Sequence, residues 1–226
     1  GAGAQNSSSV TSTINITASN DTPVATAGAT LAYSENGSAA AIDTSITLSD
    51  ADDTQITGAT VTISSGFTTG DTLGFSTQNG ISGSYSSSTG VLTLSGSATV
   101  AQYQSALRTV TYSSSSEDPT STSASRTVSW QVTDANSDGA GAQNSSAVTS
   151  TINLTASNDT PVATAGATLA YSENGSAAAI DNTIALSDAD DSQITGATVT
   201  LSSGLTSGDT LGFTTQNGIS GSYNSS

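Results

Sequence analysis

The sequence contains no cysteine, histidine or methionine, and only two of its 226 residues are basic. The missing cysteine and histidine exclude disulfides, thiolate nucleophiles, soft-metal sites and imidazole bases. A nucleic-acid partner is not expected, because contacts with phosphates need lysine and arginine. Serine is abundant, but no histidine or lysine is present to activate it, so we expect no enzymatic activity.

Long apolar runs are also absent. No stretch of about 18 apolar residues predicts a membrane span, and the first residues show no signal-peptide pattern. A net charge of −16 and 4% aromatic residues are typical of a disordered chain. However, charged residues make up only 9% of the chain, and the 34% of hydrophobic residues occur in patterns. These patterns favour folded β structure without membrane insertion.

The chain repeats itself. Residues 1–88 align without gaps with residues 139–226, and 77 of these 88 positions are identical. A period of 138 residues fits one whole domain per repeat, so we expect a window from a longer tandem array. The segment SNDTP at 19–23 and 157–161 marks the junctions, because proline and Asn-Asp favour a break between strands. We expect a terminal strand of a preceding repeat in 1–20, a complete repeat in 21–158 and a partial repeat in 159–226.

Alternation of apolar and polar residues dominates the complete repeat. It predicts strands over 30–34, 46–48, 56–63, 81–85 and 91–94 and around 110–112, 128–132 and 148–154. The spacing of Val100, Tyr103 and Leu107 instead predicts one short helix over Ala98–Arg108. Trp130 alternates with valines and is expected in the core. The predicted fold is an all-β, antiparallel sandwich of about seven to nine strands.

Acidic residues cluster at the expected turns and junctions. Asp50, Asp52 and Asp53 bring three carboxylates into four residues, and these like charges repel one another. Two arginines in the whole chain cannot neutralise such clusters, so a hard cation is the simplest compensation. Ca²⁺ takes six to eight oxygen ligands of the kind that these loops contain. We expect the acids outside the clusters to be ordinary loop residues: Asp43, Asp71, Glu117 and Asp118.

The segment Asp134-x-Asn136-x-Asp138-Gly139 matches the first half of an EF-hand loop. Its twelfth position is Ser145 instead of the bidentate glutamate, and no helices are expected on either side. It is therefore not an EF-hand, although such a turn can hold Ca²⁺ when other loops complete the shell. The alternative interpretation is a polar turn with solvated carboxylates.

Stretches such as ASNDTPVA, LAYSENGSAAAI, ITLSDADD and RTVSWQVTD carry a resemblance that extends over the whole period. The unit resembles the cadherin-like repeats of large bacterial surface proteins, including RTX-type adhesins exported by type I secretion. The resemblance implies a Greek-key sandwich of the cadherin or immunoglobulin-like kind that binds Ca²⁺ at its junctions. Glu35, Asp50-x-Asp52, Asn20-Asp21 and Asp134 are similar to the corresponding cadherin motifs, while the cadherin Asp-Arg-Glu motif has no clear counterpart. The predicted metal ligands are Asn20, Asp21, Glu35, Asp50, Asp52, Asp53, Asp134, Asn136, Asp138, Asn158, Asp159, Glu173, Asp188, Asp190 and Asp191.

The expected function follows from the tandem repeat and from the position of the acidic residues at turns and junctions. We expect a structural repeat of an extracellular, cell-surface adhesive fibre that Ca²⁺ rigidifies at the junctions and whose partners are neighbouring copies of the same repeat. One alternative is an adhesin module that binds a glycan or a host protein. Another is a subunit of a multi-chain filament or sheath, in which exposed sheet edges pair between chains.

Overall fold

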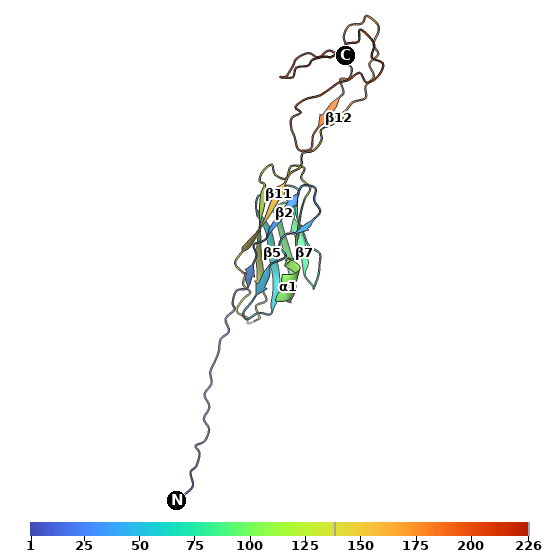
Figure 1. Cartoon of the computed structure of the whole chain (residues 1–226). Helices are drawn as coiled ribbons and strands as arrows, with labels where there is room; N and C mark the ends of the chain where they lie inside the picture. The colour runs from blue at the N-terminus through green and yellow to red at the C-terminus, as the bar shows by residue number, and fades with distance from the viewer. Residues whose placement is uncertain (138, 226) are drawn as a thin grey trace. The chain divides into compact units, whose positions relative to one another are not determined.

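A computed structural model describes residues 1–137 and 139–225. The chain divides into two compact units, Gly1–Ser157 and Asn158–Ser226, which we call unit 1 and unit 2. Unit 1 carries nearly all of the regular structure (Figure 1). No helix among the described residues has the length and apolar character needed to cross a membrane.

The strands of unit 1 follow the predicted alternation closely. In chain order the elements are β1 (Val24–Thr26), β2 (Thr30–Ser34), β3 (Ala40–Ala41), β4 (Thr47–Ser49), β5 (Gln55–Ser65), β6 (Asp71–Gly74), β7 (Ser82–Ser86), β8 (Val91–Thr99), α1 (Val100–Leu107), β9 (Thr111–Ser114), β10 (Ser125–Asp134) and β11 (Val148–Thr155). The prediction of an all-β fold with one short helix is confirmed. The short strands β1, β3 and β6 were not predicted, because two to four residues are too few to show a period.

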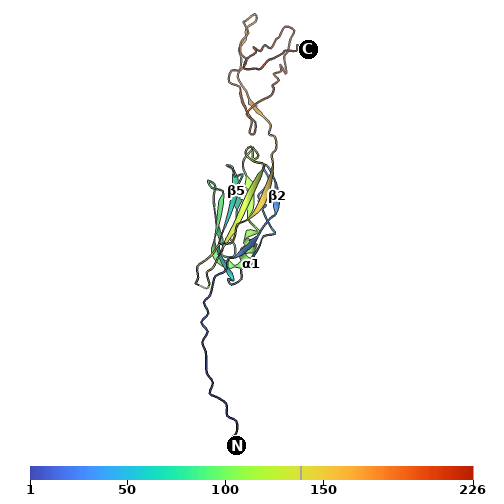
Figure 2. The same ribbon diagram turned by 90° about the vertical axis from the view of Figure 1, so that its left-hand side faces the viewer.

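Two main layers form the sandwich. The larger sheet has the order β2-β11-β10-β5-β8-β7, and the smaller has the order β3-β9-β6; β1 and β4 form a separate pair. The strands run along the long axis of unit 1, and α1 lies near the end at which the N-terminal segment enters (Figure 2). All pairs are antiparallel except one, since β11 runs parallel to β2. The predicted antiparallel sandwich is thus confirmed apart from this pair, whose direction local patterns do not encode because the two strands lie far apart in sequence.

Local sequence explains why the elements form where they do. Alternate side chains of β10 are buried along its whole length, as expected for a strand with one face on the core. Thr99 begins α1 with a capping box, because its hydroxyl accepts from the Gln102 amide while the Gln102 side chain accepts from the Thr99 amide. Asn79 and Gly80 both have positive φ, which gives the tight turn before β7.

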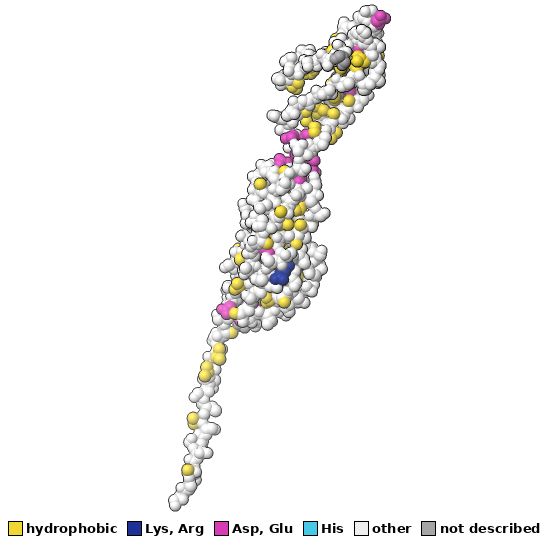
Figure 3. All heavy atoms as spheres, in the orientation of Figure 1, with side chains coloured by type: hydrophobic (Ala, Val, Ile, Leu, Met, Phe, Trp, Pro, Cys, Tyr) yellow, Lys and Arg dark blue, Asp and Glu magenta, His cyan; other side chains and the backbone are white. Residues whose placement is uncertain are grey.

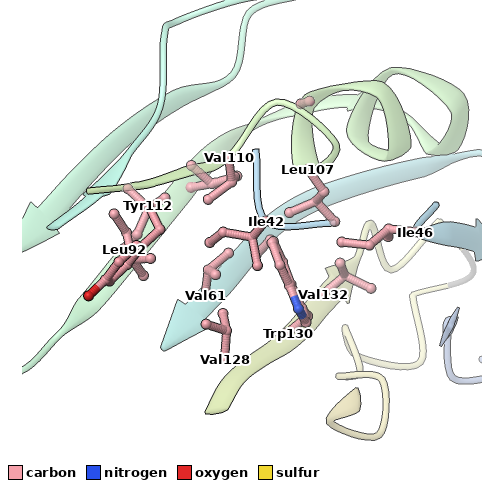
Figure 4. Packing of buried hydrophobic residues seen from close by; sticks show 14 of the residues in the cluster. Ile42, Ile46, Val61, Leu92, Leu107, Val110, Tyr112, Val128, Trp130 and Val132 are labelled. Carbon is pink, nitrogen blue, oxygen red and sulfur yellow. The ribbon is translucent and has the colours of Figure 1, made fainter. Parts of the chain in front are cut away.

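The core lies between the two sheets. Trp130 and Val128 from β10, Val61 from β5 and Leu92 from β8 belong to one buried cluster with Tyr112 of β9, which lies beside Leu92 (Figure 4). Trp130 is 1% exposed, as predicted for a core residue, and its ring nitrogen donates to the Ser150 hydroxyl at 3.0 Å. The buried indole is thus hydrogen-bonded, which removes the cost of an unsatisfied polar group.

Two acids predicted to be ordinary loop residues are buried in unit 1. Asp71 lies in β6 and forms an ion pair with Arg126 of β10 at 2.7 Å, with both side chains fully buried. Tyr112 also donates its hydroxyl to Asp71 at 2.6 Å. Asp43 is 1% exposed and accepts hydrogen bonds from four residues. The prediction failed for both because sequence distance conceals the partners that satisfy them.

Residues 1–19 form no strand, although 1–20 were expected to contain the terminal strand of a preceding repeat. Val10, Ile14 and Ile16 are all more than 80% exposed. The corresponding position in unit 1, between β2 and β10, is filled by β11 itself. The segment therefore has no partner strand within unit 1.

The described part of unit 2, residues 158–225, has two strands, β12 (Val162–Thr164) and β13 (Ala185–Ser187), which pair with each other. These two strands are the copies of β1 and β4. Its apolar side chains are largely exposed, including Tyr171 at 59% and Ile219 at 60%. Unit 2 therefore repeats the sequence of unit 1 without forming its core.

Candidate metal site

The three segments predicted to bind a cation meet at one end of unit 1. The first is residue 20, just before β1; the second is the loop 50–53 between β4 and β5; the third is the turn that follows β10 at Asp134. Because β5 and β10 are antiparallel and Asp134 pairs with Ile56, the start of β5 lies beside the end of β10. On the face shown in Figure 3, acidic side chains gather towards the ends of unit 1.

Asp50, Asp53 and Asp134 form the centre of this site. One carboxylate oxygen from each lies within 4.8 Å of the others. Asp134 is 0% exposed and Asp53 is 4% exposed, so two of the three acids are buried. Three carboxylates held this close repel one another strongly away from bulk water, and the repulsion needs a compensating positive charge.

Asn20 completes the group from the junction segment. Its side chain is buried, and its amide nitrogen donates to Asp134 Oδ2 at 2.8 Å and to the Gly141 carbonyl at 3.1 Å. The amide oxygen of Asn20 is buried without a hydrogen-bond partner. The same holds for one carboxylate oxygen of Asp50 and one of Asp53. Buried oxygens without donors are costly, and three of them in one cluster could act as ligands to a hard cation.

Neither arginine of the chain supplies the missing charge. Arg126 is paired with Asp71, and Arg108 donates to the Ile46 carbonyl at 2.8 Å. Burial raises the pKa of Asp50, and the neighbouring Asp52 carboxylate raises it further, against the hydrogen bonds from the backbone amides of Asp52 and Asp53. The side-chain atoms at the site that could bind a metal are oxygens, which suits Ca²⁺ and not a soft metal.

The remaining predicted ligands near this end have other contacts. Asp21 donates its backbone amide to Asp52 Oδ2 at 2.9 Å. The Asn136 side chain accepts from the Gly141 amide and so closes the turn after β10. Asp138 lies outside the described residues. The structure therefore brings Asn20, Asp50, Asp53 and Asp134 together and uses Asp21 and Asn136 to hold the two loops.

Sequence reasoning missed two residues that support the site. The Ser137 hydroxyl and amide both donate to Asp53 Oδ1. Gln143 donates its amide to Asp134 Oδ1 at 2.8 Å and its side chain to the Asn20 carbonyl at 2.7 Å. Serine and glutamine carry no recognisable ligand pattern. The sequence therefore offered no signal for either residue.

Glu35 does not join this cluster. It follows β2, whose parallel partner β11 ends at Thr155, so it lies at the opposite end of unit 1. One carboxylate oxygen accepts from the Ser157 amide at 2.8 Å, and the other is buried without a partner. Nearby, Asn36 donates to Glu117 at 3.1 Å. Glu117, predicted to be an ordinary loop acid, thus joins the acids at this end.

The second copy of the predicted ligands lies in unit 2. Asp188, Asp190 and Asp191 bring one oxygen each within 4.8 Å, and Asp190 accepts from the Asp159 amide at 3.3 Å. Asn158, the copy of Asn20, is exposed, and its side chain donates to the Asp159 carbonyl. Glu173 is also exposed. The local loop is thus similar in both units, while the buried asparagine (Asn20) and the acid at the end of β10 (Asp134) are described for unit 1 alone.

A comparison with known proteins finds one similar stretch. A segment of 108 residues, 45% of the chain, is 40% identical to halomucin from Haloquadratum walsbyi and covers 1% of that protein. The chain therefore spans a very small part of the length of this relative. No protein-family model matches the chain. No solved structure matches it either.

Proposed function

We propose that the chain is part of a repetitive cell-surface protein, in which each repeat is a spacer and Ca²⁺ stiffens the junction before it. The similarity to a short segment of halomucin, a large archaeal surface protein, supports the surface-protein repeat. The cadherin-like resemblance and the extracellular, adhesive role remain predictions. The proposed role is structural and not catalytic.

The convergence of buried oxygens at Asn20 carries the proposal. Asn20 belongs to the segment that enters the unit, whereas Asp50, Asp53 and Asp134 belong to the sandwich. A cation bound by all four would fix the entering chain to the folded body. The oxygens left without donors at Asn20, Asp50 and Asp53 are those that such a cation would satisfy.

The physical effect would be a change in the stiffness of the chain. Without the cation, carboxylate repulsion at Asp50, Asp53 and Asp134 opposes the packing of the loops. Extracellular modules bind Ca²⁺ with dissociation constants of roughly 10⁻⁴–10⁻³ M. Millimolar external Ca²⁺ would thus order the junction, while cytosolic levels would leave it loose.

The test is unfolding of the whole chain in urea with Ca²⁺ and with a chelator. Trp130 is the only tryptophan and reports on unit 1 alone. At about 100 times the dissociation constant, bound Ca²⁺ adds about 2.7 kcal/mol to the free energy of unfolding. Equal midpoints in Ca²⁺ and in chelator would contradict the proposal.

A pair of variants locates the effect. Asp53→Asn combined with Asp134→Asn keeps the size of both side chains and removes two charges from the cluster. We expect this variant to lose the Ca²⁺-dependent shift and the heat of Ca²⁺ binding in calorimetry. Asp118→Asn is the control, because that carboxylate lies outside the cluster and its loss should leave both readouts unchanged.

A further inference from the structure

The pairing of β2 with β11 differs from every other pairing in unit 1. These strands are parallel, with Thr30 opposite Thr151 and Ser34 opposite Thr155. Hydrogen bonds extend the ladder at both ends. The Thr151 amide donates to the Ala29 carbonyl at 3.0 Å, and the Glu35 amide donates to the Thr155 carbonyl at 2.9 Å.

The chain enters and leaves unit 1 at opposite ends of this ladder. Asn20 contacts Asp134 at the end of β10, which is the end where the antiparallel β11 begins. The chain leaves after β11 at Ser157, beyond the other end. Since β2 is parallel to β11, tension between residues 20 and 157 pulls β2 towards its start and β11 towards its end. The two strands are then forced to slide along each other.

Buried carboxylates close both ends of the ladder. At the start, Asp43 Oδ2 accepts from the amides of Gly28 and Ala29 at 3.0 and 2.9 Å and from the Ser150 hydroxyl at 2.7 Å. It therefore ties the segment before β2 directly to β11. At the exit, Glu35 ties the end of β2 to the Ser157 amide at 2.8 Å. Hydrogen bonds to charged groups are stronger than neutral ones.

We propose that unit 1 is built to withstand tension along its axis, with the β2–β11 ladder and its two closing carboxylates as the element that resists it. Sliding parallel strands strains all the hydrogen bonds of the ladder at once. Separating the same strands sideways from one end breaks them one after another. The force needed to unfold unit 1 therefore depends on the direction of pulling, whereas the free energy of unfolding does not. This resistance to force also goes beyond the proposed stiffening by Ca²⁺, since no cation is needed for it.

The test is single-molecule pulling of the full chain through two pairs of attachment points. The chain has no cysteine, so introduced thiols give unique attachment sites. Thr22→Cys with Ser157→Cys pulls along the ladder. Ser38→Cys with Ser157→Cys pulls apart the ends of β2 and β11 at the same end of the unit. Each of the two pairs is pulled in Ca²⁺ and in chelator, so that an effect of the cation is separated from an effect of direction.

We expect a several-fold higher unfolding force for the first pair at the same pulling rate, in both solutions. Forced unfolding follows the unfolding rate and not equilibrium stability, and urea unfolding should give equal stabilities for the two pairs. Similar forces for both directions would overturn the proposal. A directional difference that vanishes in chelator would also overturn it, because the cation would then be the source of the resistance.

Ser150→Ala sharpens the assignment. It removes the hydroxyl that joins β11 to Asp43 at the start of the ladder and that also accepts from the Trp130 ring nitrogen. The buried indole left without an acceptor lowers the general stability, so both forces fall. The force along the ladder should fall by the larger factor, because separation of the Ser38 and Ser157 pair begins at the Glu35 end. Ser146→Ala, an exposed position just before β11, is the control and should alter neither force. Equal losses in both directions would contradict the assignment of Asp43 to the resisting ladder.

Discussion

Unit 1 and unit 2 share nearly the same sequence over the first half of the repeat, yet only unit 1 has a core. Ile81 is 0% exposed while its copy Ile219 is 60% exposed. Tyr33 is 4% exposed while its copy Tyr171 is 59% exposed. The difference lies in the strands around them, because the chain contains only one copy of β8, β9 and β10. Burial in this fold thus depends on the second half of the repeat.

What the two units share is short-range structure. The pair β12–β13 repeats the pair β1–β4 with the same register. The turn at Asn217 has the same positive φ as the turn at Asn79. Asp181 accepts from the amides of Gly166 and Ala167, as Asp43 does from Gly28 and Ala29. Turns and neighbouring strands therefore form from local sequence, whereas the sheet needs partners from far along the chain.

We expect the largest change in the stability of unit 2 when it is joined to a copy of the second half of the repeat. Appending a second copy of residues 89–157 after residue 226 would supply copies of β8, α1, β9, β10 and β11. We expect the copy of β5, at residues 193–203, to become protected from hydrogen exchange at the level of global unfolding, about 5–15 kcal/mol. Protection that stays near zero would show that unit 2 differs for a reason other than its absent partners.

The buried ion pair between Asp71 and Arg126 is the next difference between unit 1 and unit 2. Asp71→Ala should cost about 3–5 kcal/mol, because it leaves Arg126 buried without its counter-charge. In the copy, Asp209, the carboxylate accepts from the amide and the hydroxyl of Thr206. Asp209→Ala should therefore leave the urea unfolding of Trp130 unchanged. The measurement is tryptophan fluorescence, and equal effects of the two substitutions would contradict the account.

Core packing allows a similar comparison between matched substitutions in the two units. Ile81→Ala opens a cavity in unit 1 and should lower the free energy of unfolding by about 2–5 kcal/mol. Ile219→Ala removes an exposed side chain, so a change of no more than about 0.5 kcal/mol is expected. Thermal unfolding followed by circular dichroism, which reports on the strands of both units, checks both. A large loss from Ile219→Ala would mean that unit 2 packs more than its exposure indicates.

The smallest effect concerns Asp43. Burial raises its pKa, but the hydrogen bonds from Ser45, Gly28, Ala29 and Ser150 outweigh burial and hold the pKa well below its usual range. The stabilisation is therefore present above the unfolded pKa of about 4 and is lost as the pH falls towards the folded value. Asp43→Asn should cost about 1–3 kcal/mol at neutral pH and flatten the loss of stability between about pH 4 and pH 2.

Asp181→Asn is the matched control for that substitution. It removes the same acid from unit 2 and should leave the pH dependence of the Trp130 transition unchanged. If Asp43→Asn kept the acid sensitivity of the original chain, other carboxylates of unit 1 would be responsible for it.

Alternation and turn chemistry were enough to predict the long strands, the helix and the core position of Trp130. They could not show that β11 is parallel to β2, because direction depends on a pairing across more than 100 residues. Asp71 and Asp43 were misjudged for the same reason, since Arg126 and Ser150 are distant in sequence.

The candidate site was predictable in composition but not in assembly. The clustering of Asp50 and Asp53 was visible in the sequence, and so was the acid at Asp134. The fold alone determines that the Asn20 amide joins the same group and that Gln143 holds it there. Glu35 was grouped with these residues, yet it lies at the other end of the unit.

The place of β11 has a consequence for the order in which a repeat is made. Among the strands of the large sheet, β11 is the last to leave the ribosome, and it fills the gap between β2 and β10. A growing repeat therefore keeps its large sheet open until Thr155 has emerged. Residues 10–17 of the same chain differ from β11 only at Ile16, which is Leu154 in the copy. The sequence upstream is thus a ready competitor for the open gap, and correct folding of such an array depends on each repeat closing before its neighbour can exchange strands.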